Sequence, residues 1–130
     1  MIYHLDYETY STEPIKVGEH RYAESAEILL AGICRDDEEV ELYDVFASRK
    51  ENEPALSLLE DAADDDESPV YAHNAYFESA ITRNCFRRQF KLKPIDLHRW
   101  RCTQAMCRRM AIPESLEKAA EFLDLDVQKE

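Results

Sequence analysis

The apolar residues of this chain follow two different periods, and the period changes along the sequence. Near the N-terminus, short apolar and aromatic runs are separated by Gly, Pro and polar residues, which is typical of strands. Further on, apolar residues recur every three or four positions, as on one face of a helix. Strands are predicted over residues 2–7, 27–34, 40–46 and 70–72, and helices from Pro54, over 76–90, over 103–110 and beyond Pro113. Three strands followed by helices and one further strand predict an α/β domain with a mixed sheet.

The composition fits this prediction and narrows the class of protein. A chain of 130 residues with 45% hydrophobic residues is sufficient for one domain over 1–130 with a single core. It contains no apolar run near the ~18 residues of a membrane span and no signal-peptide pattern, so we expect a cytoplasmic protein that does not associate with a membrane. The four cysteines form no CxxC pair or zinc spacing, which favours reduced thiols, with Cys34 and Cys85 in the core.

The formal net charge of −12 is unevenly distributed. From Arg83 to Arg109 the chain has nine of its 16 Lys and Arg residues, and Asp96 is the only acid there. This segment is a candidate surface for a nucleic-acid backbone, although such runs are commonly solvated helix faces. The densest acidic run lies at 64–67. It is typical of a solvated loop, or of a surface that binds a basic partner.

Two carboxylates lie two residues apart in the first predicted strand. Asp6 and Glu8, in the string LDYET, should project from the same face because side chains alternate along a strand. Their repulsion is relieved by a hard cation such as Mg²⁺, and two such ions can assist phosphodiester cleavage. Taken alone, the pair is equally typical of a polar strand end with solvated acids.

A second polar group falls where the fourth predicted strand gives way to a helix. Asn74 and Glu78, in the string AHNAYFES, are four residues apart and should lie on one side of the helix start. Glu78 is a candidate third carboxylate for the cation site. The alternative is that Asn74 caps the helix and Glu78 complements the helix dipole. For His73, a backbone hydrogen bond is the simpler interpretation than a general base.

The ordered set of motifs resembles a known family. LDYETYS, KVGEHRYAES…EILLAGI, AHNAYFE and the string from Trp100 to the C-terminus resemble the DEDD-type 3′–5′ exonuclease domain of phage and prophage family A DNA polymerases, from Leu5 to Lys129. The resemblance implies a ribonuclease-H-like fold and a proofreading exonuclease that uses two Mg²⁺ or Mn²⁺ ions. It also implies a single-stranded DNA 3′ end and a polymerase domain as partners. An RNA exonuclease is the alternative within the same class.

The resemblance also implies roles for individual residues. Asp6 would contact both metal ions, Glu8 one of them, and Glu78 would stand where the family usually has an aspartate. Asn74 would hold the strand-to-helix junction and contact the substrate, and Thr9 would line the slot for the terminal nucleotide. The glutamate at position 78 departs from the family pattern by one methylene group but keeps an oxygen ligand.

The family's fourth carboxylate has no assigned counterpart in this sequence, which ends at Glu130. We therefore expect the fold to be incomplete at its C-terminus and to be completed by a further C-terminal segment, by a partner, or not at all. The last case predicts a nucleic-acid-binding or scaffolding module without activity. An uncovered apolar sheet surface would also favour self-association.

Overall fold

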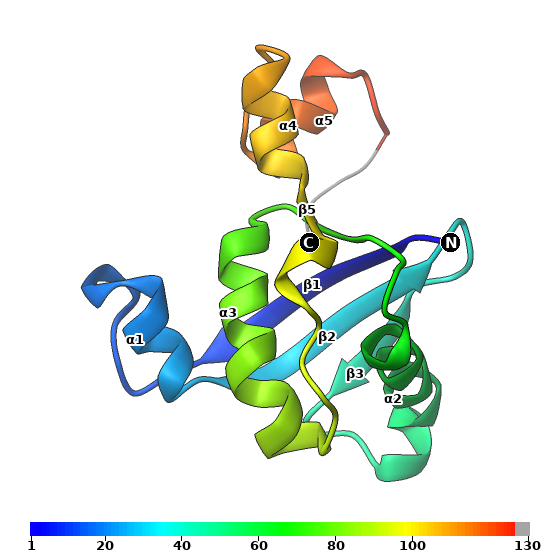
Figure 1. The fold of residues 1–130 in the computed structure, drawn as a ribbon. Helices are drawn as coiled ribbons and strands as arrows, with labels where there is room; N and C mark the ends of the chain where they lie inside the picture. Colours follow the sequence, from blue (N-terminus) through cyan, green and yellow to red (C-terminus); the bar gives the residue numbers. More distant parts are fainter. Residues whose placement is uncertain (127–130) are drawn as a thin grey trace.

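The computed structural model describes residues 1–126 and shows one mixed sheet with helices packed against it (Figure 1). The strands are β1 Tyr3–Tyr10, β2 Glu27–Arg35, β3 Glu41–Asp44, β4 Val70–Ala72 and β5 Trp100–Cys102. The α-helices are α1 Glu19–Glu24, α2 Arg49–Asp64, α3 Ala75–Cys85, α4 Thr103–Arg109 and α5 Leu116–Phe122. Short 3₁₀ turns cover Ile15–Val17 and Leu97–Arg99, and a π-helical turn over Phe86–Phe90 extends α3.

The sheet order is β3-β2-β1-β4-β5. β1, β2 and β3 form an antiparallel meander, whereas β4 and β5 run parallel to β1. This arrangement confirms the predicted α/β mixed sheet with an antiparallel start. The pairing of β1 with β4 covers only Tyr3 with Val70 and His4 with Tyr71. The second half of β1, which carries the candidate carboxylates, therefore extends past β4.

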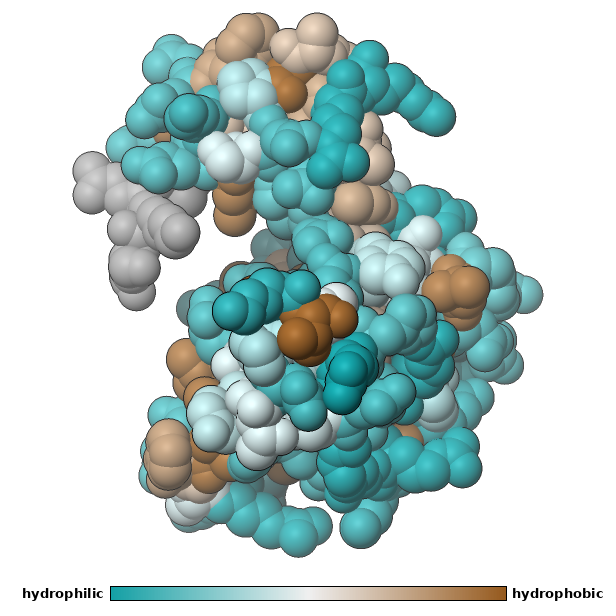
Figure 2. Space-filling model, turned by 90° about the vertical axis from the view of Figure 1, so that its left-hand side faces the viewer, coloured by the Kyte–Doolittle hydropathy of each residue, from teal (hydrophilic) through white to brown (hydrophobic). Residues whose placement is uncertain are grey.

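The core lies on one face of the sheet. Tyr3, Leu5 and Tyr7 of β1 are buried there, together with apolar residues of α2 and α3. These two helices cover the inner face in Figure 1, while α4 and α5 form a separate lobe beyond one end of the sheet. In Figure 2 the surface is indented on one side between this lobe and the body. Within the described residues, no helix is long and apolar enough to cross a membrane.

Several predicted boundaries differ from the structure. Helix α2 begins at Arg49 rather than at Pro54, because the Ser48 hydroxyl caps the helix. It accepts a hydrogen bond from the backbone N–H of Glu51 and donates one to the Glu51 carboxylate. Pro54 lies inside the helix. The helix predicted over 76–90 begins at Ala75 and changes to π-helical geometry at Phe86.

Three further differences concern elements and burial. Helix α1 and strand β5 were not predicted, because both are short and depend on tertiary contacts. Cys85 is fully buried as expected, whereas Cys34 lies on the outer sheet face and is only half-buried. The last residues of the string that carries the family resemblance, 127–130, lie outside the described residues.

Candidate nuclease site at the end of β1

Strand β1 presents its two carboxylates on the face opposite the core. Its burial alternates, with Tyr3, Leu5 and Tyr7 inside and Asp6 and Glu8 exposed. The strand period therefore places Asp6 and Glu8 side by side, as predicted. Neither carboxylate forms an ion pair with the described part of the chain, so both remain available to a cation.

A buried hydrogen-bond chain fixes the first turn of α3 beside these acids. Thr82 donates its hydroxyl hydrogen to the carbonyl of Glu78 at 2.7 Å. The Tyr7 hydroxyl lies 2.6 Å from the Thr82 hydroxyl, and since Thr82 has one hydrogen to donate, Tyr7 must be the donor. Tyr7 sits between Asp6 and Glu8 on β1. These hydrogen bonds therefore fix the position of Glu78 relative to both carboxylates.

Removing the Thr82 hydroxyl and removing the Tyr7 hydroxyl from this hydrogen-bond chain should have different costs. Thr82→Val would leave the buried Tyr7 hydroxyl without an acceptor, and we expect a loss of about 1–3 kcal/mol in the free energy of unfolding. Tyr7→Phe would leave Thr82 bonded to Glu78, so its loss should be smaller, about 0.5–1.5 kcal/mol. Urea denaturation of both variants measures the difference. The reverse order would contradict the donor assignment.

Glu78 is a buried acid with an unsatisfied oxygen. Its side chain is 5% exposed, and its Oε2 has no hydrogen-bond partner among the described residues. Burial raises the pKa of Glu78 to about 8, and the charges of Asp6 and then Glu19 raise it as well, against a bond to its own backbone. Because a buried carboxylate without a partner is unfavourable, this oxygen is a candidate cation ligand.

Sequence reasoning missed Glu19, which the structure brings to the same place. Glu19 is the first residue of α1, and its Oε2 is also buried without a partner in the described chain. Asn74 donates to its other oxygen at 3.4 Å. Gly18 precedes it with a φ of 111°, a conformation that L side chains rarely adopt. A glycine before a short polar run was the only sequence signal for this turn.

The two residues predicted to bind substrate have structural partners. The Thr9 hydroxyl lies 2.8 Å from that of Tyr22 and so connects the end of β1 to α1. Asn74 precedes α3 at the N-cap position, but its side chain makes no capping bond and reaches Glu19 instead. The roles predicted for both residues therefore remain predictions.

The donor chemistry of the site suits a hard divalent cation. Asp6, Glu8 and Glu78 offer only carboxylate oxygens, and the orphaned Oε2 of Glu78 is directed into the protein rather than into solvent. Within residues 1–126, however, no three His, Cys, Asp or Glu side chains are close enough to hold a metal ion as they stand. The residues fit Mg²⁺ or Mn²⁺ by type, and their side chains would have to move closer together to bind it.

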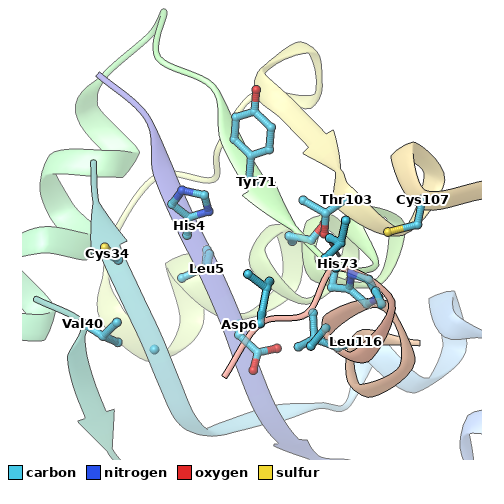
Figure 3. Close-up of a pocket in the computed structure, with 16 residues that line it drawn as sticks. His4, Leu5, Asp6, Cys34, Val40, Tyr71, His73, Thr103, Cys107 and Leu116 are labelled. Atoms are coloured by element: carbon cyan, nitrogen blue, oxygen red, sulfur yellow. Dashed lines mark hydrogen bonds between the residues drawn. The ribbon is translucent and has the colours of Figure 1, made fainter. Parts of the chain in front are cut away.

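A largely apolar pocket of about 530 Å³ lies beside Asp6 (Figure 3). His4 and Asp6 of β1, Tyr71 of β4 and Leu116 of α5 line it, so it is formed between the outer sheet face and the α4–α5 lobe. His73 also lines it and bonds the Thr103 hydroxyl and the Glu114 carbonyl, which confirms the predicted backbone contact. Glu8, Glu78, Thr9 and Asn74 are not among the residues that line the pocket.

The basic segment does not form one continuous surface. Arg99 is 2% exposed, Arg88 bonds the Ala26 carbonyl, and Arg108 pairs with Glu114. Arg83 contacts His20 of α1, the residue after Glu19.

Comparison with known proteins places this geometry in a known fold. Brucella melitensis NrnC has the same arrangement, with a TM-score of 0.59 and 19% identity, over 99% of this chain and 55% of that one. NrnC is a DEDD-type nuclease with a ribonuclease-H-like fold, so the predicted fold class is confirmed. At this identity, the likeness establishes the fold alone.

The sequence itself is similar to a DNA polymerase of Bacillus phage SP02, with 30% identity over 129 residues. The match covers 97% of this chain and 18% of the phage protein. The predicted resemblance to a phage DNA polymerase is therefore confirmed. This chain spans less than a fifth of that polymerase and about half of NrnC. No family model matches the sequence.

Proposed function

We propose that this chain is a metal-dependent 3′–5′ exonuclease unit of a phage-type DNA polymerase that removes nucleotides from single-stranded DNA 3′ ends. One observation carries the proposal: Asp6 and Glu8 share the open face of β1, and a buried, unpartnered Glu78 carboxylate lies near Asp6. The similarity to a phage polymerase and the fold of a DEDD-type exonuclease support the same class of reaction.

Asp6, Glu8 and Glu78 would hold two Mg²⁺ or Mn²⁺ ions. When bound, such ions supply an activated water and neutralise charge on the departing oxygen. The side chains of this protein position that chemistry. Asp6 and Glu8 would face the terminal phosphate from β1, while the Tyr7–Thr82–Glu78 chain keeps α3 in register. The pocket beside Asp6 has a volume suited to a nucleotide base, with Tyr71 and Leu116 in its wall.

The test is cleavage of single-stranded DNA labelled at its 5′ end, with Mg²⁺ or Mn²⁺. We expect products shortened stepwise from the 3′ end, and we expect them to disappear with EDTA or in the Asp6→Asn/Glu8→Gln double variant. Glu24→Gln, an exposed glutamate at the far end of α1, is the matched control and should cleave normally. An RNA strand of the same sequence separates the two sugar preferences.

The second candidate is a nucleic-acid-binding or scaffolding module without activity. It is favoured by the absence of a converging group of three ligands among the described residues. Under this alternative, the wild-type chain binds the labelled strand in a gel-shift assay but never shortens it. Because the related polymerase is much longer than this chain, the same assay should be repeated with the polymerase region added as a partner.

A further inference from the structure

The α4–α5 lobe is not part of the hydrophobic core. Within residues 1–126, the core contains no residue of either helix, and Ala119 is the only buried residue in the two helices. The apolar side chains of Leu116, Phe122 and Leu123 stay exposed. A pocket of about 530 Å³, rather than packed side chains, separates α5 from the outer sheet face. Apolar burial therefore contributes little to the position of the lobe, which depends on its covalent connection to β5 and on polar contacts.

His73 joins this lobe to the sheet through both nitrogens of its ring. It directly follows β4, and its Nδ1 lies 2.9 Å from the hydroxyl of Thr103, the first residue of α4. The Thr103 hydroxyl also lies 3.3 Å from the Ala72 carbonyl of β4. Nε2 bonds the Glu114 carbonyl in the segment between α4 and α5, and it carries the hydrogen because a carbonyl only accepts. One ring thus connects the end of β4 to the start of α4 and to the start of α5.

The bond to Glu114 determines where α5 begins. Ser115 follows Glu114 and caps α5 by accepting a hydrogen bond from a backbone N–H of its first turn at 3.2 Å. Leu116, the first residue of α5, lines the pocket beside Asp6 (Figure 3). The Glu114 side chain also pairs with Arg108 of α4, which ties this segment to the rest of the lobe. Holding the Glu114 carbonyl therefore holds the part of the lobe that forms the pocket wall.

We infer that His73 is a positioning residue that closes the α4–α5 lobe over the outer sheet face and thereby forms the pocket beside Asp6. When its bond to the Glu114 carbonyl breaks, the lobe turns about its connection to β5 and α5 leaves the pocket wall. In the closed state Thr103 and Glu114 engage both ring nitrogens, so the ring has no free acceptor for the role of a general base. The inference goes beyond the proposed function, because it concerns how the pocket is formed and not what the chain cleaves.

The cysteines of the chain can report the position of the lobe. Cys34 of β2 and Cys107 of α4 line the pocket from the sheet and from the lobe, whereas Cys85 is buried in the core. The test measures how fast a bulky maleimide labels each cysteine of the 130-residue chain, by mass spectrometry of its peptides. In His73→Ala, we expect Cys34 and Cys107 to be labelled about two- to tenfold faster than in the wild type, the shift that loss of one hydrogen bond gives to an opening equilibrium. Cys85 should be labelled as slowly as in the wild type.

Two further variants separate the hydrogen bond from the presence of a histidine. His73→Gln keeps an N–H donor within reach of the Glu114 carbonyl, so labelling of Cys34 and Cys107 should return toward the wild-type rate. His98→Ala is the matched control, since it removes an exposed histidine from the turn before β5 and should be labelled as the wild type is.

Three outcomes would overturn the inference. Equal labelling of Cys34 and Cys107 in His73→Ala and in the wild type would show that other contacts hold the lobe. An equal acceleration at Cys85 would show that His73 supports the whole fold. If His73→Gln behaves as His73→Ala does, the bond to the Glu114 carbonyl is not what closes the lobe. The labelling requires neither a metal ion nor DNA, so its result is independent of the proposed function.

Discussion

Between about pH 5 and pH 8, the metal-free protein is expected to lose on the order of 2–4 kcal/mol of its free energy of unfolding through Glu78 alone. Burial, followed by the charge of Asp6, raises the pKa of Glu78 from 4.5 to about 8 in the folded protein. In this window the folded state keeps a proton that the unfolded state releases. The contribution of Glu78 is therefore fully present below about pH 4.5 and is lost as the pH rises to about 8.

Glu78→Gln provides the measurement, because glutamine has nearly the same shape and cannot ionise. Urea denaturation at several pH values should show that the variant is more stable than the wild type at pH 8 and similar to it near pH 4.5. The exposed Glu24→Gln variant should keep the wild-type slope. The difference between the Glu78→Gln and wild-type curves, rather than the wild-type curve alone, decides the result. Parallel curves would contradict the prediction.

The same proton connects stability to metal binding. A cation needs the ionised form of Glu78, so Mg²⁺ or Mn²⁺ should stabilise the wild type more at pH 8 than at pH 6. Asp6→Asn should lower the pKa of Glu78, because the charge of Asp6 is its second cause. The metal-free Asp6→Asn variant is therefore expected to lose less stability with rising pH than the wild type does. Stability that falls with pH in the metal-free protein, together with a metal-induced gain in stability that rises with pH, would distinguish a cation site from a core that is only destabilised by a buried acid.

Local periodicity was sufficient to predict part of this site. The period of two along β1 placed Asp6 and Glu8 on one face, and the spacing of four placed Asn74 and Glu78 on one side of a helix start. Both rules act within a single element, and the strand face is observed as predicted. The sheet order was not predicted strand by strand, but an antiparallel start followed by a further strand was sufficient for the fold class.

What the sequence did not reveal depends on contacts between elements. Glu19 joins the site because the six-residue helix α1 packs on α3 through Tyr22 and Phe77, and a helix this short has no reliable periodic signal. Strand β5 has three residues and exists through its pairing with β4. The start of α2 was recoverable, because Ser48 followed three residues later by Glu51 matches the sequence signature of a helix N-terminus.

Arg99 is the clearest case in which the pattern of charges along the sequence was misleading. It lies in a basic segment that reads as a surface, but the structure buries its guanidinium at 2% exposure. Its Nε donates to the Ser68 carbonyl at 2.8 Å and its Nη1 to the Ala62 carbonyl at 2.7 Å. It thereby joins the end of α2 to the loop that leads into β4, and β4 is followed by His73, Asn74 and helix α3 with Glu78.

Arg99→Ala is therefore expected to lower the free energy of unfolding by about 3 kcal/mol or more, because one buried and one partly buried carbonyl lose a charged donor and a large side chain leaves a cavity. Arg101→Ala is the matched control. Its exposed guanidinium bonds only the nearby carbonyls of His98 and Trp100, and its loss should change stability by less than about 0.5 kcal/mol.

Hydrogen exchange should also show which part of the structure the Arg99→Ala substitution destabilises. Amide hydrogen exchange in Arg99→Ala should accelerate first in β4 and in the loop before it, while β2, in the middle of the antiparallel meander, should stay protected. Since β4 positions Glu78, cation binding should weaken in this variant although no ligand is changed. Uniform exchange across the sheet would instead show that Arg99 supports the whole core and does not act specifically on the junction that presents the site.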